Sequence, residues 1–183
     1  PPFESHKGFL AFLKWRIFGD RPKYPEWIQS TYKKVPFRRT SDGQVSATFI
    51  NHATVLLQVE GVNILTDPIW SERASPFSWI GPKRIRKPGI RFEDLPPIDF
   101  VLLSHNHYDH MDIPTLKKLK IQHSPLFLVG LGNEVYLKDK GITNTVALDW
   151  GDKHQVKENF AIHFTPAQHW SKRGLFDNNE MLW

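Results

Sequence analysis

The spacing of apolar residues predicts a series of β-strands that begins at residue 45 of this chain. Residues 45–50 and 54–59 are rich in β-branched and other apolar residues, in the pattern of half-buried strands. Residues 62–66 continue this pattern after the turn sequence Glu60-Gly61. The second and third of these strands are therefore expected to form a hairpin.

From residue 98 onward, apolar runs alternate with segments of helical character. Residues 98–103 are apolar except at Asp99, which is typical of a strand buried in a mixed or parallel sheet. Pro114 then favours a short helix over residues 113–120. This alternation of strand and helix predicts an α/β protein. The remaining elements expected are strands at residues 125–129, 145–148 and 160–165 and a helix at residues 133–140.

Residues 1–44 differ from the rest and are expected to form an N-terminal extension of a domain at residues 45–183. Residues 8–19 have helical potential, with an apolar face formed by Phe9, Phe12, Leu13 and Ile17. Such a helix either docks on the domain or, being basic and aromatic, lies at a lipid interface or pairs with another subunit. Residues 20–36 contain three prolines and are expected to be a linker along the surface.

Composition and charge narrow the class of protein. The 183 residues are 40% hydrophobic and include seven Trp and thirteen Phe, which is typical of a folded chain with a sizeable core. The absence of cysteine excludes disulfides, zinc fingers and thiol nucleophiles. A net charge of +5 suits an anionic membrane surface or a phosphate-bearing substrate, and no nucleic-acid partner is expected because no such module is visible. No run of 18 apolar residues occurs, so no membrane-spanning segment is expected within these residues. The sequence begins with Pro1 rather than Met, so the presence of an upstream signal or anchor is left open.

The strongest chemical signal is the sequence Ser-His-Asn-His-Tyr-Asp-His at residues 104–110, directly after a predicted strand. The carboxyl end of a strand is where α/β sheets usually carry their functional groups. In an extended segment, residues two apart point the same way, so His105 and His107 can hold one metal ion together. Asp109 and His110 follow where the chain turns and are aimed at a second ion nearby. These ligands suit zinc, with iron or manganese as substitutes, and the alternative is a solvated histidine-rich loop without metal.

Two further residues are candidates for supporting a metal ligand through a hydrogen bond. Asp67 follows the predicted strand at residues 62–66, and its carboxylate can orient a metal-binding histidine. The alternative for Asp67 is an aspartate that caps a turn. His52 lies between the first two predicted strands, where it is either a buried, hydrogen-bonded loop histidine or a residue beside the metals.

The motif at residues 104–110 resembles the signature of the metallo-β-lactamase fold superfamily, whose members are mostly hydrolases with two metal ions. The resemblance implies a four-layer αββα sandwich, of which this chain is expected to supply the N-terminal half plus the extension. It also implies a third histidine for the first metal on a later loop, and His169 is the matching residue after the strand predicted at residues 160–165. The superfamily's bridging aspartate and last histidine are not found before Trp183, so we expect the chain to be part of a longer protein.

A closer resemblance is to the phospholipases D that hydrolyse N-acyl-phosphatidylethanolamine, or to their bacterial-type relatives. It implies a zinc-dependent phosphodiesterase that uses a metal-activated water and gives phosphatidic acid and an N-acylethanolamine. The blocks that carry this resemblance follow the family's order and lie at residues 51–55, 65–69, 73–76, 81–84, 95–99, 104–112, 165–170, 172–173 and 182–183.

The resemblance also implies roles for the motif residues. His105, His107 and His169 would hold the first zinc ion. Asp109 and His110 would hold the second and take part directly in catalysis. Five other polar residues are candidates for contacts to the substrate, with an ordinary polar rim as the alternative: Gln168, Lys172 and Arg173 beside the third histidine, and Lys83 and Arg84 further upstream.

Residues 71–93 have little periodicity and much functional character. A loop of this length inside a compact domain is usually a lid, a binding loop or an insertion. Its cations can meet lipid head groups while Phe77 and Trp79 enter the acyl chains, and the alternative is a solvated basic loop. The partners expected are therefore a phospholipid substrate and a membrane surface, with peripheral membrane association; a homodimer stays open.

Two rival functions remain at this stage. One is a soluble metal-dependent lactonase or small phosphodiesterase of the same fold, because one metal signature serves many substrates. The other, of a different class, is a lipid-binding protein with a vestigial metal site. Dependence of activity on detergent or liposomes would separate the first rival, and the intact motif argues against the second.

Overall fold

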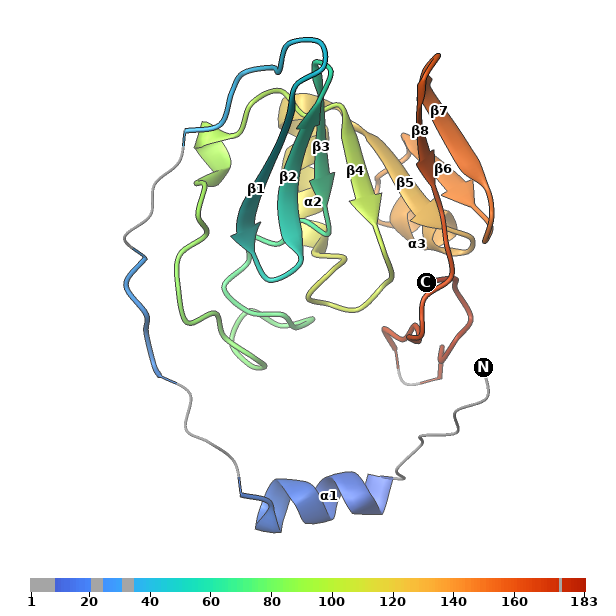
Figure 1. The fold of residues 1–183 in the computed structure, drawn as a ribbon. Coiled ribbons are helices and arrows are strands. Elements are labelled where there is room, and N and C mark those ends of the chain that lie inside the picture. The colour runs from blue at the N-terminus through green and yellow to red at the C-terminus, as the bar shows by residue number, and fades with distance from the viewer. Residues whose placement is uncertain (1–8, 21–24, 31–34, 175) are drawn as a thin grey trace.

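The computed structural model describes residues 9–20, 25–30, 35–174 and 176–183, and it shows an α/β fold with a mixed six-stranded sheet (Figure 1). The spatial order of the strands equals their order along the chain. They are β1 (Val45–Asn51), β2 (Thr54–Val59), β3 (Val62–Thr66), β4 (Phe100–Leu103), β5 (Leu126–Gly130) and β6 (Thr145–Leu148).

The sheet changes from antiparallel to parallel at β3. Strands β1, β2 and β3 pair as antiparallel hairpins, whereas β3, β4, β5 and β6 are parallel to one another. Parallel neighbours require crossover connections, and helices α2 (Ile113–His123) and α3 (Asn133–Asp139) provide two of them. The predicted mixed sheet and the predicted hairpin are confirmed.

Helices α2 and α3 cover one face of the sheet, where the core lies (Figure 1). Alternate residues of the central strands point to this face, and Val101, Phe127 and Val129 are completely buried there with Leu116 and Leu119 of α2. The opposite face of the same strands carries Leu102 and Leu128. Together with Ile162 and Phe164, these line a cavity of about 360 Å³.

A second, two-stranded sheet consists of β7 (Lys153–Lys157) and β8 (Phe160–His163). The sequence did not predict β7, because Lys-His-Gln-Val-Lys has only one apolar residue and its alternate side chains are exposed. Strand β8 ends two residues earlier than predicted. The described part of residues 45–183 thus contains a helical layer, a main sheet and a second sheet, in agreement with the expected part of a four-layer sandwich.

Several element boundaries differ from the prediction, by one to three residues. Strand β1 extends to Asn51, and β4 begins at Phe100, two residues later than expected. Helix α2 continues to His123 because the first residue unable to extend it is Ser124, whose left-handed conformation (φ 49°) lets its N–H bond to the carbonyls of Leu119 and Lys120. A short 3₁₀ helix, η1 (Phe92–Asp94), lies within the long loop before β4.

The N-terminal extension contains the predicted helix, α1 (Phe9–Phe18). Of the residues predicted for its apolar face, Leu13 and Ile17 are 38% and 61% exposed. Part of the expected linker lies outside the described residues, but the segment just before β1 packs on the sheet: Gln58 donates a hydrogen bond to the carbonyl oxygen of Phe37 at 2.7 Å. Among the described helices, none is long and apolar enough to cross a membrane.

Candidate metal centre

The loop between β4 and α2 carries the histidine motif, and two completely buried residues fix it. Met111 packs in the core, and Asn106 accepts a hydrogen bond from the N–H of Lys172 at 2.9 Å. Between them the chain turns tightly, because the N–H groups of His110 and Met111 both donate to the carbonyl oxygen of His107, at 3.1 and 2.8 Å. The motif is therefore held on a rigid turn rather than on a free loop.

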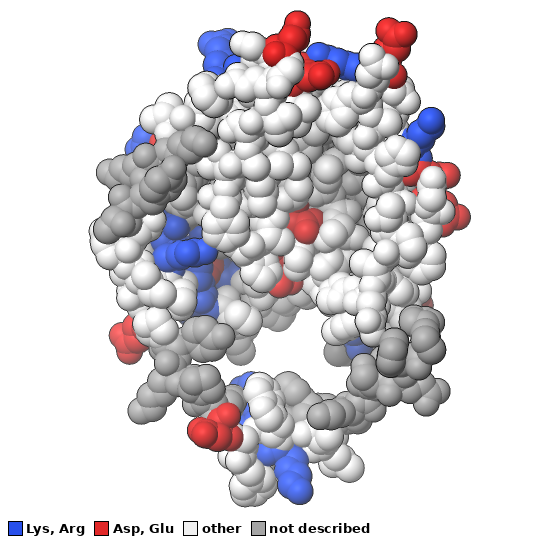
Figure 2. Space-filling view, viewed as in Figure 1, with Lys and Arg blue, Asp and Glu red and all other residues white. Residues whose placement is uncertain are grey.

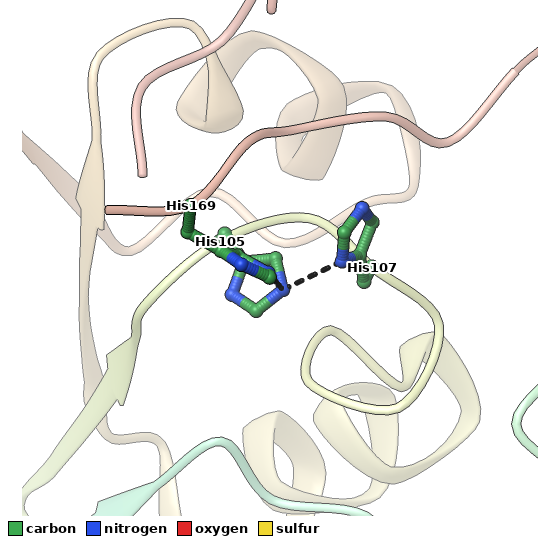
Figure 3. A group of neighbouring side chains, drawn as sticks. All are labelled: His105, His107 and His169. Atoms are coloured by element: carbon green, nitrogen blue, oxygen red, sulfur yellow. Dashed lines mark hydrogen bonds between the residues drawn. The ribbon is translucent and has the colours of Figure 1, made fainter. Parts of the chain in front are cut away.

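Three histidine side chains converge beside this turn (Figure 3). Nε2 of His105 lies 2.8 Å from Nδ1 of His107 and 3.0 Å from Nε2 of His169. One ring nitrogen from each of the three lies within 4.8 Å of the others. His169 reaches the group from the segment after β8, 64 residues away in sequence. The structure thus brings together the residues that were predicted for the first metal, and we call them the three-histidine group.

The electrostatics of the three-histidine group suit a bound cation. Burial, together with the charges of the neighbouring histidines, lowers the pKa of His105 to about 3, and burial lowers the pKa of His107. Both rings are therefore neutral at pH 7, and Nε2 of His107 is buried without a hydrogen-bond partner. Three imidazoles with converging nitrogen atoms fit a divalent ion such as zinc, iron or manganese.

A second group lies beside the first and contains a carboxylate. Oδ2 of Asp109 lies 2.8 Å from Nε2 of His52 and 3.5 Å from Nε2 of His110. We call these residues the carboxylate group. The hydrogen bond to His110 lowers the pKa of Asp109 well below its usual range. Although burial lowers the pKa of His110, its hydrogen bonds to Asp109 and Asp67 outweigh burial and raise that pKa to about 9.

The structure places both predicted supporting residues at this centre. Asp67, which is buried, accepts hydrogen bonds from Nδ1 of His110 at 2.8 Å and from the N–H and hydroxyl of Ser104 at 2.8 and 2.7 Å. The Ser104 hydroxyl also lies 2.9 Å from Nδ1 of His105. One carboxylate therefore orients a histidine of each group, directly or through Ser104. His52 is exposed over half of its side chain and lies at Asp109, beside the proposed metal ligands.

A cavity of about 490 Å³ opens onto both groups. Its lining includes His107, Asp109 and Trp170, together with Lys83 and Arg84 of the long loop. Arg84 is half-buried, and its guanidinium donates to the carbonyl oxygen of Ser71 at 2.6 and 3.1 Å, so it organises the loop. Lys83 is exposed and lies 3.8 Å from Glu72, which leaves its ammonium able to meet an anion.

Of the three polar residues predicted beside the third histidine, Gln168 is exposed, and Lys172 is partly buried and fixed through its backbone to Asn106. For Arg173 the structure corrects the prediction. Its guanidinium points into the protein, where it donates to the carbonyl oxygens of Asn106 and Met111 at 2.8 and 2.9 Å. Arg173 therefore braces the motif loop through Nη1, and it is not among the residues that line the cavity.

Two aromatic residues complete this brace. The Arg173 guanidinium lies 4.2 Å from the centre of the Tyr108 ring, and its Nε donates to the hydroxyl of Tyr136 at 2.9 Å. Sequence reasoning missed both tyrosines and Ser104. The position of Ser104 and Tyr108 within the motif could have indicated a role at the site. Nothing in the sequence marks Tyr136, which is on α3.

Comparison with known proteins gives consistent matches. A family model described as "Beta-lactamase superfamily domain" matches residues 62–183. N-acyl-phosphatidylethanolamine-hydrolyzing phospholipase D 1 of Caenorhabditis elegans is 42% identical over 152 residues, covering 78% of this chain and 43% of that protein. The mitochondrial protein of the same name from Saccharomyces cerevisiae is 40% identical over 126 residues, covering 67% of this chain and 27% of that protein.

Among solved structures, a metallo hydrolase from the archaeon Ignicoccus hospitalis is similar in fold, with a TM-score of 0.54 and 23% sequence identity. The match covers 69% of this chain and 50% of that one. The chain therefore spans less than half the length of the two curated relatives and half that of the solved structure.

Proposed function

This chain belongs to the beta-lactamase superfamily domain family, and we propose that it is part of a metal-dependent hydrolase that cleaves N-acyl-phosphatidylethanolamine. The bond cleaved is the phosphodiester bond on the head-group side, so the products are phosphatidic acid and an N-acylethanolamine. The observation that carries the proposal is the convergence of His105, His107 and His169 beside the carboxylate group, in a chain similar to two phospholipases D.

The residues present fit a pair of divalent metal ions, which we propose to be zinc, with iron or manganese as substitutes. Such a pair lowers the pKa of a bound water and stabilises negative charge on a phosphate. His105, His107 and His169 would hold one ion through neutral imidazole nitrogens. Asp109 and His110 would hold the other, and the lowered pKa of Asp109 keeps its carboxylate ionised at neutral pH.

The chain's own residues prepare the site in two ways. Asp67 fixes the orientation of the His110 ring through its Nδ1. Lys83 brings a cation to the lining of the cavity that opens onto His107 and Asp109, where a phosphate oxygen of the substrate would lie. Metal ions held by these residues would supply an activated water, so no nucleophilic side chain would be needed.

The test uses the complete protein from which this chain derives, loaded with zinc. It is incubated with N-acyl-phosphatidylethanolamine in mixed micelles, and the products are identified by mass spectrometry. Phosphatidic acid and N-acylethanolamine are expected, and both should be lost in a His107→Ala variant. The matched control is His163→Ala, which removes an exposed histidine at the end of β8.

Two other results would contradict the proposal. Zinc binding without turnover of this lipid would indicate that the substrate is a lactone or a small phosphodiester instead. The absence of both turnover and metal would favour a lipid-binding protein with a vestigial site.

A further inference from the structure

We propose that the tip of the long loop between β3 and β4 is a docking surface for an anionic lipid membrane. The tip carries Phe77, Trp79 and Ile80, whose side chains are 54%, 72% and 51% exposed. The rings of Phe77 and Trp79 lie together, with centroids 5.7 Å apart. Neighbouring large apolar side chains on a surface indicate a contact that covers them.

The tip is held out on a braced turn. Arg73 and Lys83 pair across the base of the turn as an antiparallel bridge, and Arg73 donates to the carbonyl oxygen of Gly81 at 2.6 Å. Gly81 has a φ of +100°, and a Cβ at this position would lie 2.7 Å from the Cβ of Ser75, so the turn requires glycine. The exposed apolar side chains therefore belong to a defined structure.

The base of the loop is tied to the domain. Arg84 donates to the carbonyl oxygen of Ser71, and the hydroxyl of Ser71 donates to Asp112, the N-cap residue of α2, at 2.8 Å. The base of the loop is therefore joined by hydrogen bonds to the start of the helix that follows the histidine motif.

The loop that carries the apolar tip is rich in cations. Residues 71–89 contain five Lys and Arg residues and a single acidic residue, Glu72. Figure 2 shows Lys and Arg side chains gathered at the lower left of the sheet, and Arg86 lies over the exposed ring of Phe49 on β1, 5.3 Å from its centroid. Aromatic rings beside lysine and arginine are the combination that suits the head-group region of an anionic bilayer.

Charge favours a membrane over a second copy of this chain. A symmetric dimer made through this surface would place the same cations opposite one another, and like charges repel. A bilayer with anionic lipid instead presents phosphate groups to the cations and acyl chains to Phe77 and Trp79.

The position of this surface also connects it to the metal centre. Ala74, Pro82 and Lys83 of the same loop line the cavity that opens onto His107 and Asp109. Docking at the tip brings a lipid head group to the mouth of this cavity. This step rests on the proposed function. The docking surface itself stands on the exposed residues and their charges.

The test measures binding of the complete protein, freed of metal, to vesicles that contain no N-acyl-phosphatidylethanolamine, so that it is independent of hydrolysis. We expect flotation with phosphatidylcholine vesicles that contain phosphatidylglycerol, and weaker flotation with phosphatidylcholine alone. Each cation that meets the anionic surface should contribute roughly five-fold in affinity at low salt. Raising the salt concentration should therefore release the chain, a result that requires no variant.

Two matched variants locate the surface. Phe77→Ser with Trp79→Ser should weaken vesicle binding by at least about ten-fold, because two rings lose their apolar contact with the lipid. Ile121→Ser with Val135→Ser removes two exposed apolar residues from α2 and α3 and should leave binding unchanged. Circular dichroism establishes that both variants fold.

Three results would overturn the proposal: no binding to anionic vesicles, equal binding to neutral vesicles, or equal effects of the two variants. A change of oligomeric state in the tip variant without a change in vesicle binding would assign the surface to a second copy of the chain. Failure of lipid hydrolysis with intact vesicle binding would contradict the proposed function alone.

Discussion

The two groups of candidate metal ligands lie side by side but differ in charge. The three-histidine group offers neutral imidazoles, because the pKa values of His105 and His107 lie below their usual range. The carboxylate group instead holds an internal ion pair, because the pKa of His110 is raised to about 9 between two carboxylates. In the three-histidine group three ring nitrogens converge, whereas in the carboxylate group His110 is already hydrogen-bonded to Asp67 through Nδ1 and lies 3.5 Å from Asp109 through Nε2.

This difference indicates an order of filling. The three-histidine group presents converging ring nitrogens and should bind the first ion most tightly. In the carboxylate group, the negative charge of Asp109 is already balanced by its histidine neighbours without metal. Its ion should therefore bind more weakly and depend on the residues that orient His110. The following predictions separate the two groups by changing one at a time.

The largest effect is expected from removing a ligand of the three-histidine group. His107→Ala leaves two imidazoles, so the affinity for the tighter ion should fall by more than about 100-fold. Metal content after gel filtration, measured by plasma mass spectrometry, provides the readout. His163→Ala is the control, and an unchanged metal content in His107→Ala would show that the group does not bind the ion.

Asp67→Asn should act mainly on the other group. An amide accepts hydrogen bonds from Ser104 and His110 less strongly than a carboxylate, so the affinity for the weaker ion should fall by about 10- to 100-fold. Titration calorimetry with zinc resolves the two ions. Asp94→Asn, a change in an exposed aspartate of η1 paired with Arg91, is the control. An equal loss of affinity for both ions would contradict the prediction that Asp67 acts mainly on the carboxylate group.

A smaller effect is expected from the arginine brace. Arg173→Ala frees the segment that carries His169 from the motif loop, and should lower the free energy of unfolding by about 2–3 kcal/mol and the affinity of the first ion by about ten-fold. Arg173→Lys should not restore either property, because a lysine lacks the planar fork that reaches two carbonyls while stacking on Tyr108.

Thermal unfolding and metal titration measure the two effects. Arg91→Ala removes an exposed arginine as the control. Rescue by Arg173→Lys would indicate that charge alone, without the fork geometry, holds the loop.

The smallest effect lies outside both groups. Burial lowers the pKa of His123, whose ring packs against Phe92 and accepts a hydrogen bond from the N–H of Ile98. Since the folded state disfavours the proton, His123 contributes stability above the unfolded pKa of about 6.5, which is lost as pH falls through the lower folded pKa.

The metal-free chain should therefore lose thermal stability on acidification below pH 6.5, and His123→Gln should reduce that loss. Thermal melts at several pH values supply the measurement. The pH-dependent stability that comes from His123 has to be subtracted before any pH effect is assigned to the metal ligands. An identical acid dependence in His123→Gln would contradict the assignment.

Much of the fold could be predicted because its signals are local. The apolar runs of β2 and β3 and the proline at the start of α2 mark these elements by residue type. Strand β7 could not be predicted, since its polar residues pair with β8 and only that partner makes it a strand. The position of α1 relative to its surroundings likewise depends on contacts that its sequence does not encode.

The candidate site divides in the same way. The motif spacing indicated His105, His107, Asp109 and His110, and family resemblance added His169 from a distant loop. The role of Arg173 could not be predicted, because a cation beside a histidine suggests a phosphate contact until its carbonyl and aromatic partners are known. Those partners come from α3 and the motif loop, far from Arg173 in sequence.

The central claim is that the three-histidine group takes the first metal ion. X-ray absorption at the zinc edge, with one equivalent of zinc added to the chain, tests it most directly. The account predicts three imidazole nitrogens at about 2.0–2.1 Å from the zinc, falling to two in His107→Ala. A zinc ion surrounded mainly by oxygen atoms, or a spectrum unchanged in His107→Ala, would contradict it.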